Sequence, residues 1–244
     1  MIVLFTDFGL AGPYTGQVNA VLQQVAPRVP VIQLFADAPA GQPRPASYLL
    51  AAYAVWFPAG TVLLCVVDPG VGGDRRPLIV EADGRLYVGP DNGLFEPVLR
   101  RAASPRCWEI AWRPPLLSAS FHGRDLFAPA AARLALGEAP GAMARSAAAA
   151  RQPGWPDDLP EIVYIDHYGN AMTGLRGECL MPGARLACGS RSIAQAEIFS
   201  AVPAGEAFWY VNANGLIEIA VNRGRADQAL GLAVGSPVAM LVSL

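Results

Sequence analysis

An acidic and a basic residue flank a glycine-rich stretch in residues 65–80, CVVDPGVGGDRRPLIV. An apolar run ends at Asp68, and Pro69 and three glycines follow it, which indicates a strand leading into a loop. Glycines carry no Cβ atom, so a ligand can approach the backbone closely there. Because ligands bind at the carboxyl ends of strands in open α/β sheets, Asp68 and Arg75 are candidates for one ligand pocket. The alternative is a surface turn with a weak ion pair.

Both histidines of the chain lie in polar motifs beside predicted elements. His122 belongs to FHGRD (residues 121–125) ahead of a predicted helix, and a solvated loop histidine is the alternative to a functional one. His167 belongs to IDHYGN (165–170) at the end of a predicted strand. Two histidines without clustered cysteines do not predict a zinc site. The triplet DFG (7–9) copies the magnesium-binding triplet of protein kinases, but no strand lysine or glycine-rich flap precedes it.

The elements that must position these residues alternate between strand and helix in the first part of the chain. Apolar runs and apolar residues at helical spacing distinguish the two. The predicted strands are 2–5, 29–34, 62–67, 78–81, 86–88 and 107–111, and the predicted helices are 14–25, 46–56, a segment capped by Asp91 through Leu99, and 126–136. This alternation predicts an α/β domain with a mostly parallel sheet sandwiched by helices. The first strand delivers Asp7 to its carboxyl end.

The pattern changes after a Pro-rich joint at residues 147–158, AAAARQPGWPDD. Short strand signals follow at 161–165, 185–188, 207–211, 216–221 and 237–242, with one short helix at 226–230. These predict a smaller all-β barrel domain. We therefore expect an α/β domain at residues 1–150 and a β-barrel domain at 158–244.

Composition narrows the class of protein. Hydrophobic residues make up 53% of the 244 and charged residues only 16%, which favours an oligomer that covers part of its surface. A net charge of -2 without a basic run argues against a nucleic-acid partner. Residues 46–67 carry no charge, but Pro58 and Gly60 interrupt them, so a buried helix and strand explain them better than a membrane span. Four cysteines without CxxC spacing or a secretory leader predict reduced thiols in the cytoplasm.

Five motifs in order give the chain a family resemblance. They are TDFG (6–9), VVDPGVG (66–72) followed by Arg75, GPDNG (89–93), FHGRD and IDHYGN. Together they resemble the S-adenosylmethionine (SAM) hydrolases, also called SAM hydroxide adenosyltransferases, which are related to fluorinase and chlorinase. The resemblance spans both domains. It implies that the α/β domain at residues 1–150 carries the catalytic loop and that the β-barrel domain at 158–244 contributes substrate-binding residues. It implies a homotrimer with sites between neighbouring subunits, and attack of water on the ribose 5′ carbon of SAM to give adenosine and methionine, without a metal or bound cofactor.

The resemblance places the catalytic set on Asp68, Arg75 and His122. The leaving group is a neutral thioether departing from a sulfonium, so no general acid is needed. The barrier lies in presenting a desolvated water or hydroxide in line with the carbon–sulfur bond. Asp68 can accept a proton or orient the water, and the two basic groups can stabilise hydroxide character. Which of the three takes the proton stays open at this point.

The same resemblance assigns substrate contacts. It implies that Asp7 holds the ribose hydroxyls, that Phe121 packs against the substrate, that Asp166 faces the methionine ammonium and that Asn170 faces the adenine edge. Residues 212–223 resemble the remaining substrate strand, and the candidates there are Asn214, Glu218 and Arg223. For each of these the alternative is a cap, a turn or a polar residue at the edge of the core.

Some positions depart from the family pattern, and other functions compete with hydrolysis. Gly12 replaces a usual acid, residues 213–214 replace a serine-containing pair, and residues 34–37 lack a Ser-His pair. A halogenase acting on SAM is the nearest rival, but a carboxylate beside the nucleophile would repel a halide by roughly 1 kcal/mol or more. A non-catalytic adenosine or SAM sensor, and a methyltransferase that releases S-adenosylhomocysteine, are the others.

Overall fold

The computed structural model of the chain describes residues 1–179 and 184–241. The chain divides into two compact units, Met1–Pro153 and Gly154–Leu244. The boundary between them falls inside the Pro-rich joint at residues 147–158. Each unit is described separately below.

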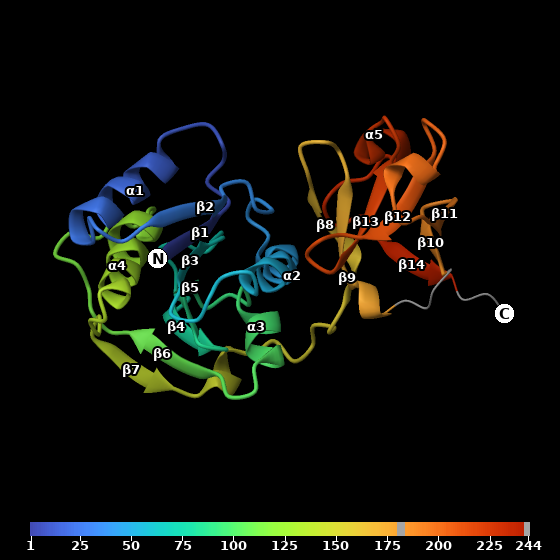
Figure 1. Ribbon diagram of the computed structural model, residues 1–244. Coiled ribbons are helices and arrows are strands. Elements are labelled where there is room, and N and C mark those ends of the chain that lie inside the picture. The colour runs from blue at the N-terminus through green and yellow to red at the C-terminus, as the bar shows by residue number, and fades with distance from the viewer. Residues whose placement is uncertain (180–183, 242–244) are drawn as a thin grey trace. The chain divides into compact units, whose positions relative to one another are not determined.

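The first unit is a seven-stranded sheet with helices on both faces (Figure 1). The strand order is β2-β1-β3-β5-β4-β6-β7. Its strands are β1 (Ile2–Thr6), β2 (Val31–Phe35), β3 (Val62–Val66), β4 (Pro77–Ala82), β5 (Arg85–Pro90), β6 (Arg106–Ile110) and β7 (Ala142–Arg145), and its helices are α1 (Tyr14–Val25), α2 (Pro43–Ala54), α3 (Glu96–Arg101) and α4 (Ala128–Ala135). The predicted α/β class is confirmed for this unit.

The direction of pairing changes across this sheet. Strands β2, β1, β3 and β5 pair in parallel, whereas β4, β6 and β7 add antiparallel ladders. The cause is the β4–β5 hairpin, whose two-residue turn places Asp83 and Gly84 at positive φ (48° and 75°), as a type I′ turn requires. The sheet is therefore parallel only in the half that carries Asp7 and Asp68.

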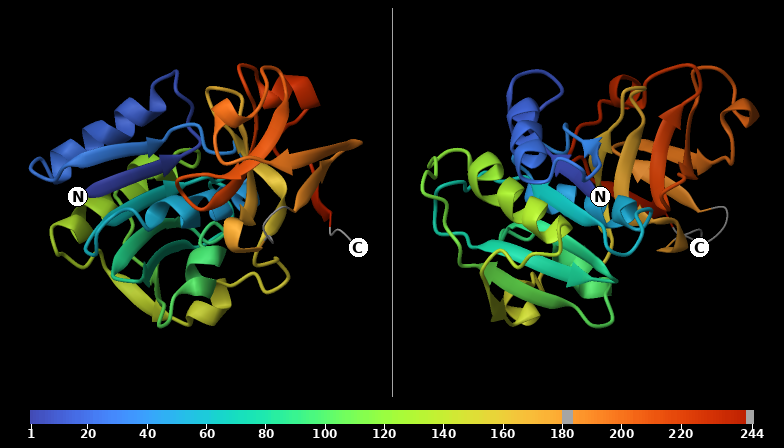
Figure 2. Two further views of the ribbon diagram at one scale, coloured as in Figure 1. Left: turned by 45° about the vertical axis from the view of Figure 1, so that its right-hand side comes forward. Right: turned by 60° about the vertical axis from the view of Figure 1, so that its left-hand side comes forward.

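Alternating side chains of the parallel strands pack against helices on opposite faces. Ile2, Leu4 and Leu64 join a buried cluster with α1 and α4, which lie side by side (Figures 1 and 2). On the other face the ring of Phe5 lies 5.3 Å from that of Phe35, which lies 5.0 Å from Tyr53 of α2. Both faces being buried explains why the strands read as continuous apolar runs.

Several element boundaries differ from the sequence prediction. Helix α2 begins at Pro43, because proline is well suited to the first turn of a helix. The helix expected from Asp91 begins at Glu96, since Asp91 to Leu94 form a loop. The helix expected at 126–136 begins as a π-helical turn, Gly123–Phe127, before α4. Strand β7 was not predicted, because the sequence AMAR has no strand signal and forms only by pairing with β6.

The second unit is a nearly closed β-barrel. Its described strands are β8 (Leu159–Ile165), β9 (Ala171–Arg176), β10 (Arg185–Cys188), β11 (Arg191–Gln195), β12 (Ala207–Val211), β13 (Leu216–Val221) and β14 (Val238–Leu241), with one helix, α5 (Ala226–Leu230). They form one sheet in the order β14-β10-β11-β12-β13-β9-β8. Its two edges meet where Ile162 exchanges backbone hydrogen bonds with Gly235 and Ser236. The predicted all-β barrel is confirmed, and the last strand expected, 237–242, extends one residue beyond the described part.

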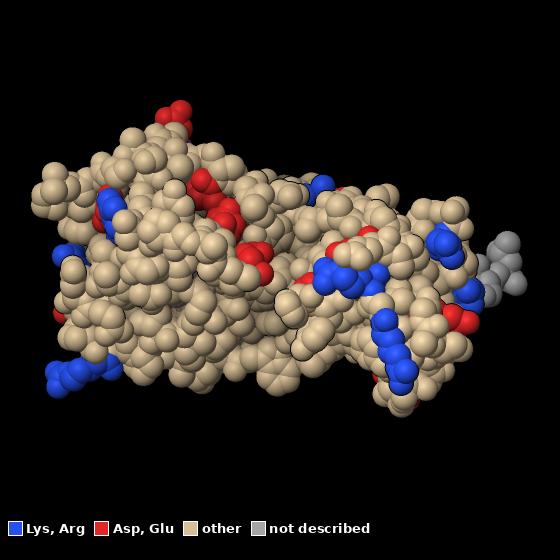
Figure 3. Space-filling view, turned by 90° about the horizontal axis from the view of Figure 1, so that it is seen from above, with Lys and Arg blue, Asp and Glu red and all other residues tan. Residues whose placement is uncertain are grey.

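The surface carries few charges, as the composition indicates. In Figure 3 most of the visible face is neither acidic nor basic, and the charged side chains form small separate groups. Within the described residues no helix is both long and apolar enough to cross a membrane. All four cysteines are free thiols.

Candidate active site

Asp68, Arg75 and His122 form one connected cluster in the first unit. The Arg75 Nε donates to both Asp68 carboxylate oxygens at 3.0 Å, and its Nη2 donates to Oδ2 at 2.6 Å. The same Nη2 lies 2.8 Å from Nδ1 of His122. The exposed fractions of the Arg75 and Asp68 side chains are 10% and 4%, so this is a buried pair and not the weak surface pair considered as the alternative.

The contact with Arg75 determines the protonation of His122. A guanidinium can only donate, so Nδ1 of the imidazole must accept, and the neutral ring then carries its proton on Nε2. Burial lowers the pKa of His122 from its usual value, and the positive charge of Arg75 lowers it further, while Asp68 opposes both. His122 is therefore a hydrogen-bond donor through Nε2 and has no free lone pair.

Asp7 directly follows β1, which lies next to β3, the strand that leads to Asp68. Strands β1 and β3 pair in parallel, with Thr6 opposite Val66, so both carboxylates follow the same edge of the sheet. Oδ2 of Asp7 accepts the backbone N–H of Gly41 at 2.8 Å. Burial raises the pKa of Asp7, and the charge of Asp68 adds to this, while the Gly41 hydrogen bond opposes it. The same edge of the sheet thus carries two acidic side chains with different hydrogen-bond donors, the Gly41 backbone for Asp7 and the Arg75 side chain for Asp68.

An aromatic group lies beside this cluster. The rings of Phe8, Tyr14 and Phe121 contact one another with centroids 5.4 to 6.4 Å apart. The Arg124 guanidinium lies over the Phe121 ring at 5.0 Å. Phe121 was a candidate from the sequence. Phe8 and Tyr14 were missed, although Phe8 stands inside the TDFG motif.

Two glycines bring the loops of this cluster together. Gly72 has φ +80°, and a Cβ atom there would collide with the Ala119 carbonyl of the loop that leads to His122. A Cβ atom at Gly123 would meet the ring of Phe8 at 2.8 Å. The sequence predicts that a ligand approaches the glycine loop after Asp68. At Gly72 the group that approaches is instead another part of the backbone.

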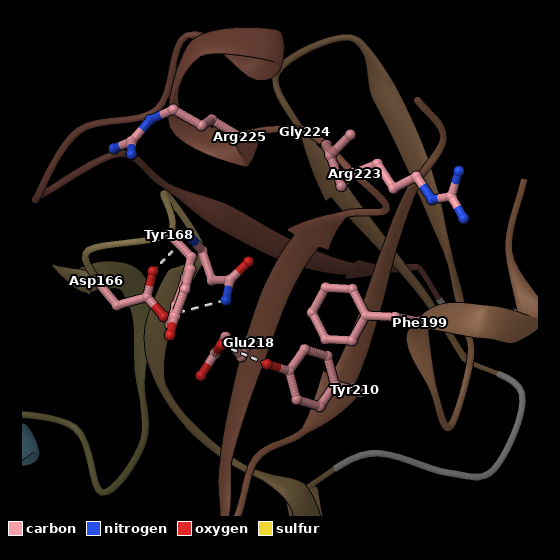
Figure 4. A pocket seen from close by; sticks show the side chains of 10 residues that line it. Asp166, Tyr168, Phe199, Tyr210, Glu218, Arg223, Gly224 and Arg225 are labelled. Carbon is pink, nitrogen blue, oxygen red and sulfur yellow. Dashed lines mark hydrogen bonds between the residues drawn. The ribbon is translucent and has the colours of Figure 1, made fainter. Parts of the chain in front are cut away.

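A separate pocket of about 710 Å³ lies in the second unit (Figure 4). Four of the sequence candidates line it, together with residues that were not predicted. Its lining comprises Asp166, Tyr168, Asn170, Phe199, Tyr210, Glu218, Val221, Arg223, Gly224 and Arg225. Asn214 is not among them. Its backbone N–H donates to Asn212 in the turn between β12 and β13.

Two hydrogen-bonded carboxylates give this pocket its polar groups. Asp166 accepts the backbone N–H and the side-chain amide of Asn170 at 2.8 and 3.0 Å. Glu218 is 3% exposed and accepts from the Tyr210 hydroxyl at 2.5 Å and the Asn212 amide at 2.8 Å. Burial raises the pKa of Glu218, and these donors oppose the shift. The pocket therefore suits a ligand that carries hydrogen-bond donors or positive charge.

The other walls of the pocket are aromatic or backbone. Phe199 packs 5.7 Å from Tyr210, and both rings face the cavity in Figure 4. Arg223 has φ 56°, a left-handed conformation. The side chains of Arg223 and Arg225 extend away from Glu218 in Figure 4, and Arg225 pairs with Asp227 at 2.9 Å. Arg223 thus offers its backbone to the pocket.

No group of three or more potential metal ligands was found among residues 1–179 and 184–241. The cluster of the first unit consists of acids, an imidazole, a guanidinium and aromatic rings, and the pocket of the second unit of acids, an amide, aromatic rings and backbone.

Comparisons with known proteins agree with this two-unit arrangement. Residues 2–144 match the SAM hydroxide adenosyltransferase N-terminal domain, and residues 160–239 match the C-terminal domain of the same family. The chain therefore belongs to the SAM hydroxide adenosyltransferase family.

Individual relatives extend over nearly the whole chain. A protein from Thermus thermophilus named (R)-S-adenosyl-L-methionine hydrolase is 40% identical over 98% of this chain and 99% of its own. A protein of the same name from Salinispora arenicola is 37% identical over 94% and 93%. Among solved structures, an uncharacterized conserved protein from Thermotoga maritima superposes with a TM-score of 0.85 at 27% identity, covering 99% of this chain and 100% of its own.

Proposed function

We propose that this protein hydrolyses S-adenosyl-L-methionine to adenosine and L-methionine. Water or hydroxide attacks the ribose 5′ carbon in line with the carbon–sulfur bond. Full-length relatives named (R)-S-adenosyl-L-methionine hydrolase support this function. The observation that carries it is the buried Asp68–Arg75–His122 cluster, since it is a site for activating one water molecule.

The protonation pattern of the cluster assigns roles to its members. Arg75 stays protonated, and His122 has its Nδ1 lone pair on Arg75 and its proton on Nε2. Asp68 is then the one member able to accept a proton. Its Oδ2 takes two N–H bonds from Arg75 and its Oδ1 takes one, so Oδ1 is the better acceptor. In this mechanism Asp68 takes the proton of the attacking water, and the donors stabilise hydroxide character.

The departing group shapes the remainder of the mechanism. The electron pair of the carbon–sulfur bond goes to sulfur, which turns a sulfonium into the neutral thioether of methionine. No acid is required for this departure, so we include neither a metal ion nor a bound cofactor in the proposed reaction. Removing water around the sulfonium favours the step, since charge is dispersed in the transition state.

The substrate contacts follow from the family resemblance. We assign Asp7 to the ribose hydroxyls and Phe121 to packing against the substrate. The pocket of the second unit supplies Asp166 for the methionine ammonium and Asn170 for the adenine edge. Glu218 and the backbone of Arg223 complete this pocket. Its two carboxylates, Asp166 and Glu218, suit the positively charged ammonium. Asn214, which lies in the β12–β13 turn and outside the lining of this pocket, is assigned to the substrate by the resemblance alone.

We further propose a cytoplasmic homotrimer whose active sites combine residues of neighbouring subunits. The family resemblance is the basis for the trimer. Exposed apolar side chains support an assembly, among them Leu10 and Leu116, which are 82% and 86% exposed. Four free thiols fit a reducing compartment.

Incubation of the purified protein with SAM tests the function directly. We expect equal amounts of adenosine and methionine, measured by chromatography. The variant Asp68→Asn keeps the shape of the side chain but removes the proton acceptor, so kcat should fall by about 10²- to 10⁴-fold. Retained adenosine binding and an unchanged melting temperature would show that the variant is folded.

Other products would identify the competing functions. A 5′-halogenated adenosine formed in excess chloride or fluoride would indicate a halogenase, and S-adenosylhomocysteine would indicate a methyltransferase. Tight binding of SAM or adenosine without any product would indicate a sensor. Full activity of Asp68→Asn would remove Asp68 from the mechanism.

A further inference from the structure

One loop holds both ends of the segment that carries Asp68 and Arg75. The side-chain Nδ2 of Asn92 donates to the Val67 carbonyl at 2.8 Å. The backbone N–H of Asp91 donates to the Arg76 carbonyl, also at 2.8 Å. Val67 immediately precedes Asp68, and Arg76 immediately follows Arg75. The two ends of the catalytic loop are therefore fixed to neighbouring residues of the GPDNG motif.

Asn92 is itself held in one orientation. Its Oδ1 accepts the Leu94 backbone N–H at 3.2 Å, while its Nδ2 bonds Val67. If the amide oxygen and nitrogen were exchanged, the oxygen would face the Val67 carbonyl and the nitrogen would face the Leu94 N–H. Neither pair could form a hydrogen bond, so the bonding pattern fixes the orientation of the Asn92 amide. Gly89, at the end of β5, makes the approach possible, because a Cβ atom there would collide with the Cys65 carbonyl of β3.

The hydrogen bond of Asn92 replaces a missing backbone partner. Strand β3 ends at Val66, whose carbonyl accepts the Asp7 backbone N–H. Val67 lies beyond the end of the strand, and its carbonyl takes the Asn92 amide instead. The peptide plane of this carbonyl contains the Asp68 nitrogen, so the bond to Asn92 restrains the backbone from which the Asp68 side chain projects.

We propose that Asn92 is a positioning residue for the catalytic cluster, fixing the Val67–Asp68 peptide so that Asp68 meets Arg75 in the productive geometry. This inference rests on the proposed function and adds to it a residue that acts through Asp68. A displacement of Asp68 leaves the pocket of the second unit unchanged. Loss of Asn92 therefore lowers kcat more than it changes KM.

The variants Asn92→Ala and Asn92→Asp test this position. Near neutral pH both remove the donor to Val67, whereas Asn92→Asp keeps an acceptor for Leu94. We expect kcat for SAM hydrolysis to fall by about 10- to 100-fold in both, as small displacements of reacting groups do, with KM within about twofold of wild type.

The pH profile separates positioning from a general loss of structure. The carboxyl group introduced by Asn92→Asp repels the Val67 carbonyl when ionised and can donate to it when protonated. The kcat ratio of Asn92→Asp to Asn92→Ala should therefore rise as pH is lowered through the pKa of that carboxyl. A ratio independent of pH would contradict the role of the donated hydrogen bond.

A control and a second readout complete the experiment. Asn19→Ala removes a comparable amide bond, to the Thr15 carbonyl at 3.1 Å in α1, and should leave kcat unchanged. The imidazole nitrogen resonances of His122 should shift in Asn92→Ala but not in Asn19→Ala, because the cluster is displaced. This shift can be measured even if the wild-type protein releases no adenosine from SAM. Absence of adenosine would disprove the proposed function but not the positioning role of Asn92. Wild-type kcat, or an unchanged His122 spectrum, in Asn92→Ala would overturn the inference.

Discussion

Arg75 connects the other two members of the catalytic cluster, and its inability to accept a hydrogen bond decides their chemistry. Its Nε and Nη2 groups donate to Asp68, and the second hydrogen of Nη2 occupies the lone pair of His122. A lysine could not supply this geometry, since its ammonium lacks the planar fork. In the proposed mechanism, the direction of proton transfer thus follows from a single guanidinium.

The pH dependence of this cluster can be predicted from His122. Its folded-state pKa lies below the ordinary value of 6.5, first because of burial and then because of Arg75. Between the two values the unfolded chain binds more protons than the folded chain, so the stability contribution is present above pH 6.5 and is lost as pH falls. Protonating Nδ1 also replaces an acceptor with a donor facing Arg75. We therefore expect kcat to be level near neutral pH and to fall on the acid side.

Nitrogen NMR of the imidazoles can test both the tautomer assigned to His122 and the lowering of its pKa. The chain has only two histidines, so His167→Gln assigns the spectrum. Near neutral pH, His122 should show a protonated Nε2 and an unprotonated Nδ1. A proton on Nδ1 there, or a His122 titration above the ordinary range, would contradict the assigned tautomer.

The sequence predicted the polar residues of the site better than the apolar ones. Asp68, Arg75 and His122 stand in recognisable motifs, and the structure brings them together. Phe199 and Tyr210 have no such signal, because a single aromatic residue in a short turn or strand has the same sequence pattern whether it lines a cavity or fills the core. Only the folding of β12 beside the 199–201 turn places both rings at the pocket.

At the scale of elements, two loops build the cluster. One follows the parallel strand β3, the other follows the antiparallel strand β6, and glycines set their spacing. Gly72 tests this idea. In Gly72→Ala we expect both a strained backbone at φ +80° and a collision with the Ala119 carbonyl, so the loops with Asp68 and His122 must separate. Stability should fall by more than the 1–2 kcal/mol or so that a left-handed residue costs alone, and kcat should fall as well.

Gly137 provides a matched control for that substitution. Its φ is +79°, and nothing lies within 4 Å of a Cβ atom built there. Gly137→Ala therefore carries the backbone strain without the collision, and should lose stability but not activity. Urea unfolding and kcat measured on both variants separate the two effects. Equal losses in both variants would show that loop contact at Gly72 is unimportant.

Element prediction succeeded where apolar pattern and pairing agree, and failed where tertiary contact decides. Strands β1 and β3 are continuous apolar runs and were predicted within about one residue. Strand β9 was missed because Gly174 interrupts its strand signal. The structure explains the glycine, because Leu159 of β8 occupies the space that a Cβ atom at residue 174 would need. Strand β11, RSIAQ, has one buried residue, and its pairing with β10 and β12 defines it.

At the scale of the whole molecule, the low charge and the exposed apolar side chains point to association. Trp56, Leu10 and Leu116 are 66%, 82% and 86% exposed. Composition predicts this tendency, but it does not give the number of subunits or the residues that meet. Those depend on surface shape, which an averaged count of residues does not contain.

The proposed shared active sites predict that two inactive variants restore each other. Asp68→Asn damages the first unit and Asp166→Ala damages the second. If each site combines the first unit of one subunit with the second unit of its neighbour, each mixed trimer contains one intact site, which is about one third of the sites in the purified mixed trimers. We expect co-expression with two affinity tags, followed by tandem purification, to yield SAM hydrolysis that neither variant shows alone.

The double variant distinguishes exchange of sites from other causes of recovery. A chain carrying both Asp68→Asn and Asp166→Ala provides no intact half to either single variant, so its mixtures should stay inactive. If each site were built within one chain, every site in the mixture of single variants would keep one damaged half. Activity would then remain at the level of the separate variants, although light scattering would still report a trimer. Recovery of activity thus tests where the sites lie independently of the number of subunits.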